Sequence, residues 1–142
     1  MVRPSLSPAR PPRPMYTLLL VVLFALGAFW LYRKARPEIS ASEAAQRVRE
    51  GKAVLVDVRE ANEWRSGVAE PAQLLALSDL TGARTSWRPV LEANRAKEFI
   101  VYCGAGVRSG RAASILRSEG FTVVNLGGYS VWTSAGLPVR VP

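Results

Sequence analysis

The stretch that decides the fold is IVYCGAGVRSGRAASILRSEGF, residues 100–121. It opens with an apolar, β-branched run that ends in Cys103. A glycine-rich loop over 103–108 follows, and Ser109 is expected to open a helix. The helix face expected toward a core carries small and apolar side chains, those of Ala112, Ala113, Ile115 and Leu116. A buried strand, a tight loop and an amphipathic helix in this order are typical of a βαβ unit.

Two further apolar runs resemble the strand EFIVYC (98–103) that leads into this loop. AVLVDV (53–58) precedes it along the chain, and FTVVNL (121–126) follows it. Such runs are typical of strands buried on both faces of a parallel sheet. Helical patterns separate the strands, over 61–66, 87–96, 108–119 and 129–134. We therefore predict a small α/β domain, with a mostly parallel sheet flanked by helices.

An uncharged apolar segment, MYTLLLVVLFALGAFWLY (15–32), lies before this domain. As a helix it would span about 27 Å, which is close to the hydrocarbon thickness of a bilayer. Tyr16 lies near one end and Trp30 and Tyr32 lie near the other, where interfacial aromatic residues are expected. We therefore predict a single transmembrane helix over 15–32, with the membrane as a partner.

Two alternatives to this anchor stay open. A cleaved signal peptide would also have a basic start, and Ala25 and Gly27 have the spacing of a cleavage site. A buried core helix would show the same apolar composition. Basic residues are almost equally frequent on the two flanks, so charge does not set the orientation. A lone thiol is kept reduced most easily in the cytoplasm, which favours a cytoplasmic domain over a periplasmic or other extracytoplasmic one.

The segments predicted on this basis are a disordered, basic, proline-rich tail over 1–14, the apolar helix over 15–32, a linker over 33–37 and the α/β domain over 38–142.

The formal net charge is +8. Residues 1–36 hold six basic residues and no acidic one, whereas residues 37–142 hold 13 basic and 11 acidic residues. The domain is therefore close to neutral, which argues against a nucleic acid partner.

The sequence has one cysteine and no histidine. One cysteine excludes an internal disulfide and a zinc site built on several thiolates. Without histidine, neither a Ser-His-Asp triad nor a Cys-His pair can form. A nucleophile in this chain must therefore be activated in another way, and we expect neither a metal nor an organic cofactor.

Cys103 is the candidate nucleophile, because sites in open α/β sheets lie at the carboxyl ends of strands. The glycines allow successive N–H groups to point inward as an anion nest. The helix N-terminus adds partial positive charge, and Arg108 adds a full one. All three effects favour the thiolate and should lower the pKa of Cys103. The alternative is that Cys103 is a small buried core residue.

Four segments of the chain together resemble the rhodanese family of sulfurtransferases. They are VLVDVREANEW (54–64), GVAEPAQLLALSDL (67–80), VYCGAGVRSGRAASILRSEGF (101–121) and LGGYSVWTSAGLPV (126–139). The resemblance implies a single-domain rhodanese-like fold and a persulfide mechanism. Cys103 would take a sulfane sulfur from a small donor such as thiosulfate and pass it to a thiol or cyanide-type acceptor, or to a protein acceptor.

The same resemblance implies roles for particular residues. The backbone that would bind the transferred sulfur belongs to Gly104, Ala105, Gly106, Val107, Arg108 and Ser109. Asp57 and Arg59 would lie beside this loop, where we expect them to pair and to position it. By contrast, we expect Glu60 and Glu63 to complement the dipole of the helix they open.

Three features qualify the resemblance. The loop between Cys103 and Arg108 is one residue shorter than in related phosphatases, which suits a single sulfur atom better than a phosphate. Val68 and Pro71 stand where the family often has histidine and glycine, and Ala105 leaves the loop neutral. A membrane-tethered persulfide carrier and a non-catalytic interaction module are therefore kept as alternatives to an enzyme.

Overall fold

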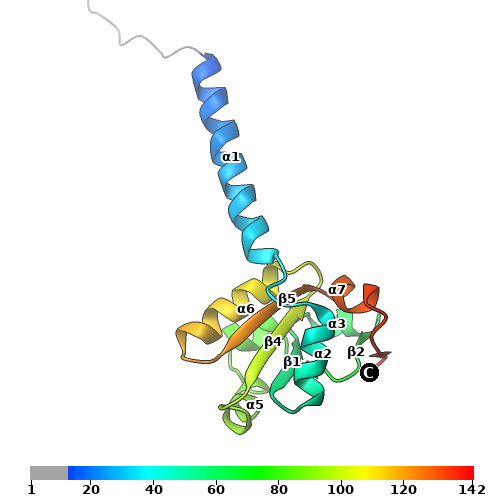
Figure 1. Cartoon of the computed structure of the whole chain (residues 1–142). Coiled ribbons are helices and arrows are strands. Elements are labelled where there is room, and N and C mark those ends of the chain that lie inside the picture. Colours follow the sequence, from blue (N-terminus) through cyan, green and yellow to red (C-terminus); the bar gives the residue numbers. More distant parts are fainter. Residues whose placement is uncertain (1–12) are drawn as a thin grey trace, which may run out of the picture. The chain divides into compact units, whose positions relative to one another are not determined.

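The computed structural model describes residues 13–142 (Figure 1). The tail predicted over 1–14 thus lies outside the described residues, except for Arg13 and Pro14, which are helical. The chain forms two compact units, and the boundary between them falls between Leu31 and Tyr32.

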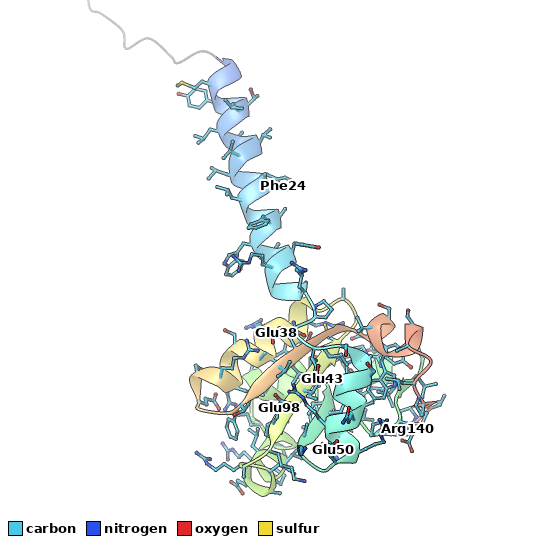
Figure 2. All side chains as sticks on the ribbon, viewed as in Figure 1. Phe24, Glu38, Glu43, Glu50, Glu98 and Arg140 are labelled. Carbon is cyan, nitrogen blue, oxygen red and sulfur yellow. The ribbon has the colours of Figure 1, made fainter. Side chains whose placement is uncertain are left out.

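The first unit consists of most of helix α1 (Arg13–Ala35), which begins two residues before the predicted span and continues into the predicted linker. The stretch Met15–Arg33 has a mean hydropathy of 2.1, and none of it is buried. Its apolar side chains project freely, as Phe24 does in Figure 2. The helix is long and apolar enough to cross a membrane, a property that signal sequences share. Pro37 explains its end, because the residue before a proline is disfavoured in the helical region.

The second unit is built on a four-stranded parallel sheet, which confirms the predicted architecture. In spatial order, its strands are β3 (Gln73–Leu74), β1 (Ala53–Asp57), β4 (Glu98–Cys103) and β5 (Val123–Gly128). Two short strands pair separately and antiparallel, and they are β2 (Val68–Ala69) and β6 (Val139–Arg140).

Helices cover both faces of this sheet (Figure 1). The face that includes Val101 and Cys103 packs against α4 (Leu77–Thr81), α5 (Trp87–Ala93) and α6 (Val107–Ser118). The opposite face, which includes Ile100 and Tyr102, packs against α2 (Ala41–Arg49) and α7 (Tyr129–Ser134). The remaining helix of this unit is α3 (Ala61–Trp64). The alternation along β4 is the period of two expected of a strand that is buried on both faces.

Several boundaries differ from the sequence-based expectations. β5 begins two residues later than predicted, and α5 and α3 end earlier, at Ala93 and Trp64. The short elements β2, β3, β6 and α4 were not predicted, because stretches of two to five residues show too little periodicity. α6 begins at Val107 instead of Ser109, because Gly106 adopts a left-handed φ of 91° and turns the chain directly into the helix.

The segment between α1 and α2 lies along the edge strand β5. The Glu38 N–H donates to the carbonyl of Asn125 at 2.8 Å, and the Asn125 N–H donates to the Glu38 carboxylate at 2.7 Å. Arg117 also donates to that carboxylate, at 2.5 Å, and Ile39 is buried in the core. Ser40 then caps α2 by accepting from the Glu43 N–H at 3.2 Å.

Candidate active site

Cys103 is the last residue of β4 and lies on the face of the sheet that α6 covers. Its side chain is only 1% exposed, and its thiol is not in a disulfide. The sequence places it there because the apolar run 98–103 must be buried on both faces, and the run ends where the glycines begin. A reacting molecule must therefore approach the sulfur across the loop that follows β4.

Backbone and side-chain donors surround the sulfur of Cys103. The Gly106 N–H donates to Sγ at 3.1 Å, and the Ser109 hydroxyl lies 3.5 Å from it. Burial alone would raise the pKa of this thiol, but hydrogen bonds from the Ser109 hydroxyl and from the backbone of Ser109, Ala105 and Gly106 outweigh burial. The net pKa therefore lies below its ordinary value, in the predicted direction. We call the backbone of residues 104–109 together with the Ser109 hydroxyl the sulfur cradle.

The sulfur cradle is tighter than the sequence suggested. The predicted loop over 103–108 is too long, because Val107 and Arg108 already belong to the first turn of α6. Gly128 at the end of β5 also approaches the loop so closely that a Cβ there would come within 2.9 Å of the Gly104 carbonyl oxygen. The end of β5 and the loop after β4 therefore lie in close backbone contact.

Arg108 does not present an unpaired positive charge to the sulfur, as the sequence had suggested. Its guanidinium donates to both carboxylate oxygens of Glu63, at 2.5 and 2.7 Å. This pair lies beside Gly104, at the start of the loop. The hydrogen bond from Arg108 lowers the pKa of Glu63 to about 2, and the same contact raises the pKa of Arg108. The pair therefore stays ionised at neutral pH, and its two charges offset one another.

Glu63 is a site residue that the local sequence pattern does not reveal. Its position predicts a role at the dipole of its helix, and its carboxylate does accept from the Glu60 N–H at 3.0 Å. The pairing with Arg108 joins residues 45 positions apart, and no local spacing reveals such a contact. Glu60 does more than complement the helix dipole, because it also accepts from the backbone and hydroxyl of Ser78 and so connects α3 to α4.

Asp57 and Arg59 pair with each other, as expected, at 2.6 Å in a fully buried position. Arg59 also donates to the Gly67 carbonyl at 2.7 Å and lies over the ring of Tyr129, 4.6 Å from its centre. The link of this pair to the sulfur cradle is indirect. Arg59 lies 3.4 Å from the carbonyl of Glu63, and the Glu63 carboxylate in turn holds Arg108.

The turn that departs from the family pattern is held in place by the strand pair of β2 and β6. Val68 is fully buried and pairs with Arg140. The Arg140 guanidinium donates to the carbonyls of Glu70 and Ala72, at 2.9 and 3.0 Å. These contacts fix the backbone on both sides of Pro71. The turn is therefore ordered, although it lacks the histidine and the glycine that the family often has there.

The Ser109 hydroxyl gives a direct test of how the thiol is activated. We expect Ser109→Ala to raise the pKa of Cys103, because one of the hydrogen bonds that favour the thiolate is lost. The pH dependence of alkylation of the full chain by iodoacetamide measures this shift. Ser118→Ala is the matched control, since that hydroxyl donates to a carbonyl three residues earlier in the same helix. An unchanged alkylation profile in Ser109→Ala would contradict this assignment.

The arrangement of hydrogen-bond donors favours reactions in which negative charge develops at the sulfur of Cys103. The buried sulfur of Cys103 lies among backbone N–H groups, and such groups stabilise negative charge where it develops. No group of three or more His, Cys, Asp or Glu residues that could hold a metal ion occurs within residues 13–142. Cys103 is the nucleophilic side chain that the loop after β4 surrounds.

Comparisons with known proteins identify a family that covers most of the chain. Residues 40–135 match the Rhodanese-like domain family. A "Sulfurtransferase" of Allochromatium vinosum is 32% identical over 108 residues, which are 74% of this chain and 95% of that protein. An uncharacterized protein of Bacillus subtilis is 36% identical over 121 residues, 80% of this chain and 91% of the relative.

A crystal structure of a rhodanese-related protein from Thermoplasma volcanium has the same fold. It is similar to this chain with a TM-score of 0.62 and 29% identity, over 75% of this chain and 100% of the other. The matched family and the sulfurtransferase relative support sulfurtransferase activity in general terms. The chain belongs to the family of proteins with a rhodanese-like domain.

Proposed function

We propose that this protein transfers sulfane sulfur through a persulfide on Cys103. The observation that carries the proposal is the sulfur cradle itself, in which the Gly106 N–H donates to Sγ at 3.1 Å. The surrounding donors lower the pKa of the thiol, so the nucleophile forms without a histidine base. The backbone of residues 104–109 then offers its N–H groups to the negative charge on the outer sulfur of the persulfide.

The proposed donor is a small molecule with a sulfane sulfur, such as thiosulfate. The Cys103 thiolate attacks the outer sulfur of thiosulfate, a new S–S bond forms, and the old S–S bond breaks. Sulfite leaves with the electron pair of the broken bond, and the negative charge of the thiolate passes to the outer sulfur of the persulfide. No proton, metal or electron carrier is needed for this step.

The second half of the reaction regenerates the thiolate. An acceptor such as a thiolate or cyanide attacks the outer sulfur of the persulfide and forms a persulfide or thiocyanate. The pair of electrons in the broken S–S bond returns to Cys103. The short loop between Cys103 and Arg108 supports sulfur as the transferred group, because it suits a single sulfur atom better than a tetrahedral phosphate.

The proposal includes a membrane anchor. α1 contains 19 residues with a mean hydropathy of 2.1, and aromatic residues lie near both of its ends. A retained anchor would confine sulfur transfer to the membrane surface, and we propose the cytoplasmic side because a lone thiol stays reduced there. The acceptor could then be a membrane protein that carries a thiol.

Intact mass spectrometry of the full chain in detergent micelles tests the proposal. After incubation with thiosulfate or an organic hydropersulfide, the protein is expected to gain the mass of one sulfur atom. Cyanide should remove this sulfur, and Cys103→Ser should never acquire it. Steady-state turnover with a small acceptor then separates an enzyme from a carrier, because a carrier loads with sulfur but releases it slowly to small molecules.

If no sulfane donor loads Cys103 of the properly folded protein, the proposal is wrong. A non-catalytic interaction module would then explain the fold better. Circular dichroism of the same samples shows whether the protein is folded, so a failure to load can be assigned to the chemistry.

A further inference from the structure

The inference concerns how an anionic sulfur donor is held, and it rests on the proposed function. Thiosulfate carries two negative charges, and its sulfonate end must be held while its outer sulfur reacts. Glu63 already offsets the charge of Arg108. The Glu63 carboxylate has no hydrogen-bond donor, and its negative charge would repel an anion. A positive charge for the donor must therefore come from another part of the molecule.

The segment between α1 and α2 packs directly against the active-site loop. A Cβ on Gly106 would collide with the carbonyl oxygen of Ala35, so only glycine fits between that carbonyl and the cradle. A Cβ on Gly127 would likewise come within 3.1 Å of the ring of Pro37. The hydrogen bonds of Glu38 to β5 hold the next residue of the segment in place. The positions of residues 35–38 are therefore fixed relative to the loop that holds Cys103.

This packing leaves a cavity beside the loop. The cavity has a volume of about 280 Å³ and is lined by Tyr32, Ala35, Arg36, Pro37 and Ala105. All of these residues belong to the unit that begins at Tyr32. Ala105 links the cavity to the chemistry, because its backbone also helps to lower the pKa of Cys103. A small anion in this cavity would thus lie beside Ala105, a residue of the sulfur cradle.

Arg36 is the cationic side chain that lines this cavity. No acidic partner within 4.0 Å holds it among the residues that the structure describes, and its guanidinium lies 5.8 Å from the centre of the Tyr32 ring. The ring leaves the N–H donors of the guanidinium available for oxygen atoms. Pro37 disfavours the helical region for Arg36, so α1 ends at Ala35 and Arg36 begins the segment that packs against the loop.

We propose that Arg36 is a substrate-binding residue that holds the anionic oxygen group of a sulfane donor. In the reaction with thiosulfate, Arg36 would hold the sulfonate, which leaves as sulfite when Cys103 takes the outer sulfur. A guanidinium forms two parallel hydrogen bonds with such a group, which adds orientation to charge attraction. The residue that selects the donor then comes from the segment next to the apolar helix, outside the loop that carries the cysteine.

The test compares two arginines, three residues apart, in the full chain. Arg36→Gln and Arg33→Gln each remove one positive charge, but Arg33 does not line the cavity. Each variant is loaded with thiosulfate or with an organic hydropersulfide that has no sulfonate or carboxylate, in uncharged detergent micelles. We expect Arg36→Gln to lower kcat/KM for thiosulfate relative to the hydropersulfide about tenfold, mainly through KM. Arg33→Gln should keep the ratio of the parent protein.

A conservative variant separates charge from structure. Arg36→Lys keeps the positive charge and should retain most of the preference for thiosulfate, although lysine cannot form the two parallel hydrogen bonds. An unchanged donor ratio in Arg36→Gln would overturn the proposal, provided that the parent protein loads sulfur. If the parent loads sulfur from neither donor, the proposed function itself fails.

A lipid headgroup is the competing partner for a basic residue at this place. Binding of the same variants to vesicles of zwitterionic and anionic phospholipid distinguishes the two. If Arg36→Gln and Arg33→Gln weaken binding to anionic vesicles equally and neither changes the donor ratio, Arg36 serves the lipid surface. That result would overturn the assignment of Arg36 to the donor.

Discussion

Gly106→Ala is expected to slow sulfur loading of Cys103 about a hundredfold. Gly106 has a φ of 91°, which costs a residue with a side chain about 1–2 kcal/mol. The added methyl group would also collide with the carbonyl oxygen of Ala35. The loop must shift to relieve this collision, and the shift removes the N–H donor that lies 3.1 Å from Sγ. Loss of one such donor, or its displacement by about 1 Å, typically reduces rates about a hundredfold.

The rate of mass gain with a sulfane donor measures this effect in the full chain. Gly51→Ala is the matched control, because Gly51 also has a left-handed φ, of 71°, but a Cβ there would meet no atom within 4 Å. It should lose stability and keep the loading rate. Equal loading rates for Gly106→Ala and Gly51→Ala would show that the collision with Ala35 does not matter.

Asp57→Ala is expected to destabilise the folded domain by about 3–5 kcal/mol, because it leaves a buried guanidinium without its partner. The side chains of Asp57 and Arg59 are 0% and 5% exposed. Burial would lower the pKa of Arg59, but the hydrogen bonds and charge of Asp57 outweigh burial and raise it. Asp57→Asn should be almost as damaging, since an amide keeps the shape but not the charge.

Urea unfolding of the full chain in micelles, followed by tryptophan fluorescence, measures these losses. Glu119→Gln breaks another two-contact pair, with Arg84, whose side chains are 33% and 28% exposed. It should cost less than about 1 kcal/mol, because water screens and solvates both groups. A loss of that small size in Asp57→Asn would mean that the buried charge is compensated elsewhere.

The parts of the fold that the sequence predicts well are those with strong periodic patterns. β4 was predicted with its observed bounds, Glu98–Cys103, because it is a continuous apolar run that ends at glycine. β5 was placed two residues too early, since Phe121 and Thr122 resemble strand residues but precede the pairing with β4. Strands of two residues, such as β2 and β6, carry no local signal and depend on a partner far along the chain.

In the candidate site too, features that depend on a local pattern are predictable, and contacts between distant residues are not. The position of Cys103 and the lowered pKa of its thiol follow from a strand, a glycine-rich loop and a helix in sequence order. The partner of Arg108 does not follow, because Glu63 reaches it only when α3 and α6 come together. The sequence does not predict the cavity beside Ala105 either. Arg36 and Pro37 precede the loop by many residues and contact it only in the folded chain.

The pairing of Glu38 with Asn125 has a consequence for biosynthesis. These residues are 87 positions apart, so a segment made early is fixed only after β5 has left the ribosome. Contacts of such long range slow folding, because the entropy of closing a large loop is lost before the contacts form. α1 is synthesised before the domain and can reach a membrane while the domain is still unfolded. Closure of this contact waits until β5 has been synthesised, so the segment of residues 35–38 is expected to be among the last parts of the domain to settle.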